Sequence, residues 1–180
     1  MFDCLLLMAG SGTRTTLNYN KIEYKINGKP LYQYSLEKFL SLKECNKVIL
    51  VVKKDEYNKY IDLVNERIDV VIGGDTRFNS VLNGARKATQ DIILIHDAAR
   101  PNTKVENIID LYNQSLNYKA CCLAVKVKDC IRNVDDSSYT LERSNLWQIQ
   151  TPQAVDRNLL IKGLESNNYS NYYDDCEVLE

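Results

Sequence analysis

The chain has 180 residues and a formal net charge of −1 at pH 7, and 44% of its residues are hydrophobic and 26% charged. This composition excludes a disordered chain, the balanced charge gives no overall attraction to nucleic acid or anionic membranes, and no apolar run approaches the length of a membrane span. The first residues lack the basic segment of a signal peptide. The six cysteines form no C-x-x-C pair and there is one histidine, so we expect neither a zinc site nor disulfides, as in a reducing compartment. We therefore expect one cytoplasmic domain, residues 1–180, that binds neither nucleic acid nor membrane.

Short apolar runs alternate with segments of helical periodicity along most of the chain. The apolar runs predict strands at 2–8, 47–52, 70–72, 92–95 and 121–127. The helical spacing predicts helices at 31–42, 55–65, 79–88, 105–116 and 157–165. Strands that alternate with helices indicate an α/β fold, with a mostly parallel, Rossmann-like twisted sheet flanked by helices.

Residues 128–146 interrupt this alternation with short β-rich pieces around the turn DDSS, which predicts a β-hairpin. A further short extended piece, 147–151, precedes Pro152, and residues 167–175 read as a loop. An isolated hairpin is marginally stable in water, so we expect a protruding arm that packs against a second copy of the chain in a homodimer.

The first predicted strand leads directly into a glycine-rich turn with the sequence AGSGTR, residues 9–14. Gly10 and Gly12 carry no Cβ, so a phosphate can approach the backbone N–H groups closely. Arg14 and Lys21 add two cations beside the turn. The turn therefore predicts a phosphate-binding site, and a plain strand-to-helix turn with incidental charge is the alternative. A P-loop is excluded, and the third glycine of a dinucleotide-binding turn is absent.

Three polar turns follow predicted strands, at residues 10–14, 74–77 and 97–100. Ligands of parallel sheets bind at the carboxyl ends of the strands. We therefore expect the three turns to line one cleft.

Several side chains in these turns leave two interpretations open. Asp97 is either a hard oxygen ligand for Mg²⁺ or a turn cap. Asp75 and Ser80 either hydrogen-bond a base or cap the next helix. His96 is either a general base or, as we favour, a hydrogen-bonded structural residue. Arg143 alone would be a solvated charge.

Together these segments resemble the family of cytidylyltransferases that act on 2-C-methyl-D-erythritol 4-phosphate. The matching stretches are MAGSGTR with the following Lys21, GGDTRFNSV, IHDAARP, VKDC, RSNLWQIQTPQ and YYDD. The resemblance covers nearly the whole chain and implies a fold of the nucleotide-diphospho-sugar transferase type. It implies cytidylyl transfer from CTP to the polyol phosphate, with release of diphosphate, in non-mevalonate isoprenoid precursor synthesis. Cytidylyltransferases that form CDP-ribitol look less similar.

The resemblance also implies a role for individual residues. Catalysis would depend on Arg14, Lys21 and Arg143. CTP would be bound by Met8, Ala9, Gly10, Ser11, Gly12, Gly74, Asp75, Ser80 and Ala98. The polyol phosphate would be bound by Asp97, Arg100, Cys130 and Thr151, with Asp97 also beside the Mg²⁺ cofactor. The 128–146 arm would exchange between subunits, so that each cleft is shared in a dimer.

Some residues depart from the family pattern. Asn20 stands where a proline is usual, Ile22 where a glutamine is usual, and Cys130 where a threonine would contact substrate. Leu7 and Met8 also differ from the residues usual before the glycine-rich turn. The family continues with a strand and helix that carry a substrate-binding lysine, and nothing in the chain matches them.

The chemistry of the residues agrees with this resemblance. A phosphate monoester is already an anionic nucleophile at neutral pH, so the reaction needs no general base, and fixed cations with Mg²⁺ stabilise the growing charge. Two other classes stay open. A dinucleotide-binding module would bind NADH, and a non-catalytic nucleotide-binding protein would release no diphosphate.

Overall fold

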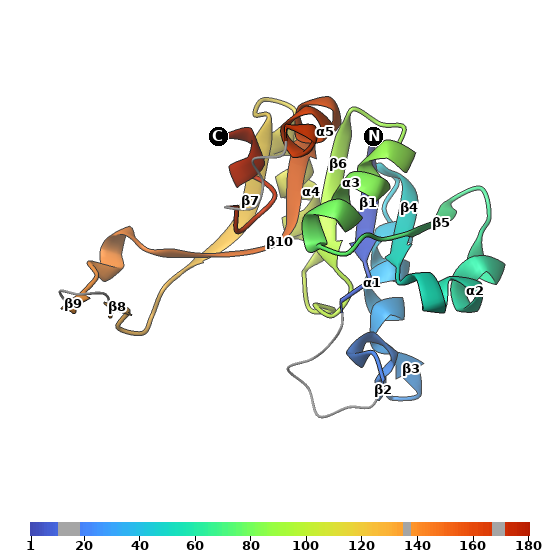
Figure 1. The fold of residues 1–180 in the computed structure, drawn as a ribbon, viewed down its shortest axis with the longest axis horizontal. Coiled ribbons are helices and arrows are strands. Elements are labelled where there is room, and N and C mark those ends of the chain that lie inside the picture. The colour runs from blue at the N-terminus through green and yellow to red at the C-terminus, as the bar shows by residue number, and fades with distance from the viewer. Residues whose placement is uncertain (11–18, 135–137, 167–171) are drawn as a thin grey trace.

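A mixed β-sheet forms the centre of the computed structural model, which describes residues 1–10, 19–134, 138–166 and 172–180 (Figure 1). Its strands are β1 (Phe2–Leu7), β4 (Cys45–Val52), β5 (Ile68–Ile72), β6 (Ile92–Asp97), β7 (Ala120–Lys126) and β10 (Trp147–Asp156). Their order is β5-β4-β1-β6-β10-β7. β1 is parallel to β4 and β6, and β4 is parallel to β5, whereas β10 is antiparallel to both of its neighbours. The predicted α/β fold with a mostly parallel sheet is confirmed.

Helices cover both faces of this sheet, because the side chains of its central strands alternate between two apolar clusters. Phe2, Cys4 and Leu6 of β1 pack with α1 (Leu31–Leu40) and α4 (Val105–Ser115). On the other face, α3 (Arg77–Lys87) and α5 (Arg157–Glu165) pack against the sheet. No helix among the described residues has the length and apolar character that crossing a membrane requires.

The single helix predicted over 55–65 is wrong. The segment consists of the 3₁₀ turn Lys54–Glu56, the short helix α2 (Tyr57–Tyr60) and the 3₁₀ turn Ile61–Leu63. Its core-packed residues Tyr57, Tyr60 and Leu63 recur at every third position. That spacing matches the turn of a 3₁₀ helix better than the longer turn of an α-helix.

β10 is twice as long as the extended piece predicted at 147–151. A proline has no N–H to donate to a neighbouring strand and usually ends an interior strand. Pro152 therefore predicts that the strand ends at residue 151, whereas β10 continues to Asp156. The pairing of β10 with β7 shifts register between Ile149 and Gln153, so Pro152 lies in the irregular part of the ladder. Beyond it, Ala154 and Val155 are fully buried and join the two clusters.

The predicted hairpin is present and extends away from the body of the molecule (Figure 1). Its two short strands, β8 (Arg132–Asn133) and β9 (Tyr139–Thr140), pair antiparallel, and residues 135–137 of its turn lie outside the described residues. A second small hairpin joins β2 (Lys25–Ile26) to β3 (Lys29–Pro30).

Candidate active site

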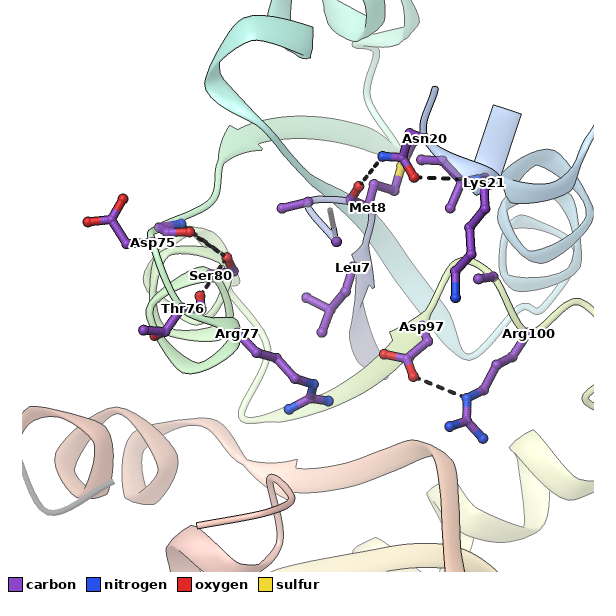
Figure 2. Close-up of a pocket in the computed structure, with 15 residues that line it drawn as sticks. Leu7, Met8, Asn20, Lys21, Asp75, Thr76, Arg77, Ser80, Asp97 and Arg100 are labelled. Atoms are coloured by element: carbon purple, nitrogen blue, oxygen red, sulfur yellow. Dashed lines mark hydrogen bonds and ion pairs between the residues drawn. The ribbon is translucent and has the colours of Figure 1, made fainter. Parts of the chain in front are cut away.

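The carboxyl ends of β1, β5 and β6 open into a cavity of about 590 Å³ (Figure 2). Its wall combines residues at and after the ends of these strands with the segment around the 3₁₀ turn Lys21–Glu23. The lining residues are Leu7, Met8, Ala9, Gly10, Asn20, Lys21, Ile22, Gly74, Asp75, Thr76, Arg77, Ser80, Asp97, Ala99 and Arg100. Three distant polar turns therefore meet at one edge of the sheet. The cleft expected from the sequence is therefore confirmed for the parts of the three turns that the structure describes.

The first wall is the end of β1 with the segment that presents Lys21. Asn20 is buried, and its Nδ2 donates to the Met8 carbonyl at 2.9 Å and to Glu56 Oε2 at 3.2 Å. Its Oδ1 accepts from the Ile22 N–H at 3.4 Å and caps the 3₁₀ turn that begins at Lys21. Asn20 therefore links the end of β1 to Lys21, whose side chain extends toward Asp97 in Figure 2.

The second wall is the turn after β5 with the first turn of α3. Thr76 caps α3 by accepting from the Asn79 N–H at 3.0 Å. The Ser80 hydroxyl accepts from the Gly74 N–H at 3.0 Å and donates to the Thr76 carbonyl at 3.0 Å. A Cβ at Gly74 would overlap Asn79, so this close approach requires glycine. Ser80 therefore fixes the turn, and the Asp75 side chain points away from Lys21 (Figure 2).

The third wall is the loop after β6. Arg100 Nε lies 3.1 Å from Asp97 Oδ2, and Arg100 Nη1 donates to Gln150 Oε1 at 2.8 Å. Behind this ion pair, the buried hydroxyl of Thr151 accepts from the Asp97 N–H at 3.3 Å and lies 3.1 Å from His96 Nδ1. His96 Nε2 lies 3.0 Å from the Arg100 carbonyl oxygen.

These contacts determine the state of His96. The Arg100 carbonyl only accepts, so Nε2 carries the proton and donates it, and Nδ1 accepts from Thr151. Burial lowers the pKa of His96 to about 4, which keeps the imidazole neutral at physiological pH. The structure therefore favours the structural role of His96, which supports the loop carrying Asp97 and Arg100.

The cavity offers a limited ligand set for a metal ion. The described residues contain no group of three or more His, Cys, Asp or Glu side chains that could hold one. Mg²⁺ is commonly bound by one or two carboxylates together with substrate phosphates. The carboxylate of Asp97, on the cavity wall, fits that arrangement when a triphosphate supplies further oxygens.

Comparison with known proteins identifies the family. Residues 3–180 match the family model described as 2-C-methyl-D-erythritol 4-phosphate cytidylyltransferase (IspD). The chain belongs to this family. The IspD enzyme of Geobacillus kaustophilus is 34% identical over 189 residues, which cover 99% of this chain and 83% of the relative. The IspD structure from Francisella tularensis has a TM-score of 0.82 at 30% identity, covering 99% of this chain and 85% of the other.

A second solved structure, 4-diphosphocytidyl-2C-methyl-D-erythritol synthase from Anaerococcus prevotii, also has a TM-score of 0.82, at 27% identity, and covers 98% of this chain and 80% of its own. These matches confirm the resemblance inferred from the motifs and the nucleotidyltransferase fold. The dinucleotide-binding alternative is wrong, because the family is one of cytidylyltransferases.

The structure brings most of the predicted IspD site residues together. On the cavity wall lie Met8, Ala9, Gly10, Lys21, Gly74, Asp75, Ser80, Asp97 and Arg100. Ala98, in the loop after β6, and Thr151, on β10, are buried and do not line the cavity. Ser11, Gly12 and Arg14 lie outside the described residues.

Two predicted site residues lie on the arm, away from this cavity. Cys130 is exposed, and Arg143 Nη1 donates to the Lys128 carbonyl at 2.8 Å. Neither residue lines the cavity of its own chain. Their predicted roles therefore require a second subunit.

Arg77 is a cavity residue that the motif analysis did not assign. Its guanidinium binds the carboxylate of Asp175 through two hydrogen bonds of 2.6 and 2.7 Å. The two residues are 98 positions apart in sequence, so no local pattern points to the pair. The only sequence signal is the basic residue in the turn after a predicted strand.

Proposed function

We propose that this chain transfers the cytidylyl group of CTP to 2-C-methyl-D-erythritol 4-phosphate. A phosphate oxygen of the polyol phosphate attacks the α-phosphorus of CTP, the bond to the bridging oxygen breaks, and diphosphate leaves. The observation that carries the proposal is the cavity, whose wall includes Lys21, Asp97 and Arg100. The match of residues 3–180 to the IspD family model identifies the reaction.

The charges of the cavity suit this reaction. The attacking group is already an anion, so the reaction does not need the buried, neutral His96 as a base. Lys21 is directed toward Asp97, where negative charge would accumulate on the transferred phosphate (Figure 2). Arg100, fixed by Asp97 and Gln150, is placed to bind the phosphate of the acceptor.

A Mg²⁺ cofactor belongs to this proposal. Asp97 would bind it together with triphosphate oxygens, and the ion would supply neutralisation of the negative charge between the two substrates. The ion pair of Asp97 with Arg100 orients the carboxylate for that purpose.

A homodimer completes the proposed site. The arm and the ends of β7 and β10 that lead to it expose large apolar side chains, namely Val125, Ile131, Val134, Tyr139, Trp147 and Ile149. An exposed apolar surface of this kind favours burial against a partner. A two-fold related subunit would cover it and would bring Arg143 and Cys130 to the other cleft.

The proposed function is tested with purified protein, CTP and Mg²⁺ by diphosphate release, first with 2-C-methyl-D-erythritol 4-phosphate and then with ribitol phosphate. We expect turnover with the first acceptor and at least tenfold lower kcat/KM with the second. Calorimetric titration with CTP, UTP, ATP and GTP should show preference for CTP, because a wrong base leaves buried polar groups unpaired. Equal affinities for the four nucleotides, or no diphosphate release, would contradict the proposal.

A further inference from the structure

Arg77 lines the cavity as the first residue of α3, and its position is set by a residue near the end of the described chain. Its side chain is 36% exposed, whereas Asp175 is fully buried. Two N–H groups of the guanidinium bind the two carboxylate oxygens, the geometry in which arginine binds a carboxylate most strongly. Burial opposes the charge on Arg77, but Asp175 outweighs it and raises the pKa of the guanidinium.

Asp175 is itself fixed to the central sheet. Its backbone N–H donates to Gln153 Oε1 at 2.8 Å, and the N–H of Cys176 donates to the same oxygen at 3.2 Å. Gln153 is buried on β10 and lies opposite Ile95 of β6, the strand that leads into the Asp97 loop. The carboxylate that orients Arg77 is therefore buried and tied to the central sheet.

β10 thus organises cations on both sides of Asp97. Gln150 binds Arg100 directly, and Gln153 holds Asp175, which holds Arg77. Figure 2 shows the Asp97 carboxylate between the two guanidinium groups. The proposed acceptor phosphate binds on this side of the cavity, opposite the Asp75 and Ser80 turn.

We propose that Arg77 is a further specificity-determining contact for the polyol phosphate, and that Asp175 is its positioning residue. This inference rests on the proposed function. The Arg77 side chain is partly exposed and lines the cavity, and a guanidinium that binds a carboxylate through two N–H groups has further N–H donors left. They donate to hydroxyl or phosphate oxygens of the acceptor. The buried carboxylate balances the charge of Arg77, so the contact acts through oriented hydrogen bonds more than through net charge.

A purely structural ion pair is the alternative, and the same helix provides a matched control. Arg86 Nη2 lies 2.8 Å from Glu165 Oε1, and this pair joins α3 to α5 as a surface bridge, with side chains 55% and 48% exposed. Neither residue lines the cavity. Removal of that pair tests the loss of an α3 ion pair without the loss of a cavity contact.

The experiment compares the full chain with the double variant Arg77→Gln/Asp175→Asn and the control Arg86→Gln/Glu165→Gln. Neutralising both partners avoids a buried unpaired carboxylate, so the variant should fold. We expect KM for 2-C-methyl-D-erythritol 4-phosphate to rise about tenfold or more in the double variant, with KM for CTP within about twofold. The control should change neither KM by more than about twofold.

Two further variants keep the proposal testable if the double variant does not fold. Arg77→Lys retains a charge opposite Asp175 but loses the planar donors, so it should also raise KM for the acceptor alone. Asp175→Asn should raise the same KM by less, because Arg77 remains but is less well oriented.

The outcomes separate this inference from the proposed function. A parent enzyme that turns over no polyol phosphate overturns both. An active parent whose folded variants keep the acceptor KM, or change only the CTP KM, overturns the role of Arg77 alone. A rise in acceptor KM equal to that in the Arg86/Glu165 control also overturns it.

Discussion

At the scale of single residues, the proposed function assigns Lys21 to the stabilisation of the transition state. Lys21 begins a 3₁₀ turn whose cap, Asn20, is buried and bonded to the end of β1, so its backbone is fixed relative to the sheet. A fixed cation of this kind stabilises charge that grows on the α-phosphate more than charge already present on CTP.

We predict that Lys21→Ala lowers kcat by about a hundredfold or more, the range for a single electrostatic stabiliser, and changes CTP affinity less. Steady-state kinetics and calorimetric titration with CTP measure the two effects. Lys25→Ala is the control, because Lys25 is exposed and does not line the cavity. A kcat within a few-fold of the parent would refute the assigned role.

His96 permits a direct test at the same scale, because it is the only histidine in the chain. Its folded pKa of about 4 lies below the ordinary value near 6.5, since burial disfavours the charged imidazolium. Between these two pH values the unfolded chain binds a proton that the folded protein does not.

We therefore predict that stability is fully present above about pH 6.5 and falls, by up to about 3 kcal/mol from this group, as the pH drops toward 4. Urea unfolding at pH 7.0 and 5.0 measures the change, and His96→Asn should reduce it. An NMR titration of the one imidazole should give a pKa near 4 with the proton on Nε2. A pKa above 6 would contradict the buried, neutral assignment.

At the scale of elements, the turn before α3 and the turn after β1 use glycine for different reasons. A Cβ at Gly74 would overlap Asn79 and lie 3.2 Å from its backbone carbonyl carbon, whereas a Cβ at Gly10 would meet no atom of the described residues within 4 Å. The first glycine therefore permits packing, and the second leaves space at the cavity wall where a phosphate could approach.

Alanine substitutions should separate these two uses. Gly74→Ala should lower both the thermal midpoint and CTP affinity, because relief of the overlap moves the start of α3 at a cost of about 1–3 kcal/mol. Gly10→Ala should weaken CTP binding with little change in the midpoint of the free protein. Thermal unfolding with and without CTP measures both effects, and a lowered midpoint for Gly10→Ala alone would reverse the assignment.

The elements that sequence could predict are those with local signals. Buried parallel strands are continuous apolar runs, so β1, β4 and β6 are evident, and the polar turns after them predict the cavity edge. β10 is harder to predict because Pro152 argues against a strand, and its antiparallel partners come from other parts of the chain. The sequence does not assign Arg77 for a similar reason, because the orientation of its side chain depends on Asp175, which only the tertiary fold brings near.

At the scale of the whole molecule, the arm is the feature that one chain does not explain. It extends from the sheet through β7 and β10, with Trp147 opposite Lys126 and Ile149 opposite Ala124 in the ladder (Figure 1). Trp147 is 53% exposed and Val134 79% exposed, so apolar side chains on this extension would remain in water. A two-fold dimer would bury them and deliver Arg143 to the partner's cleft.

The shared site predicts complementation between two inactive variants. Lys21→Ala damages the cavity of its own chain, and Arg143→Ala damages the cleft that its arm enters. In a mixed dimer, one cleft then contains both defects and the other contains neither. Random exchange of equal amounts should therefore restore about a quarter of the parental activity, because half of the dimers are mixed and each has one intact site.

The measurement is diphosphate release after exchange of differently tagged subunits, with co-purification of both tags as proof that mixed dimers formed. The control mixes Lys21→Ala with Asp97→Ala, two defects on the wall of the same cavity, which should restore nothing because every cleft of a mixed dimer then keeps one defect. Activity no higher than that of either variant alone, with mixed dimers present, would place Arg143 outside the partner's cleft. If the parent sediments as a monomer and no mixed dimers are recovered, the proposal of a shared site is wrong.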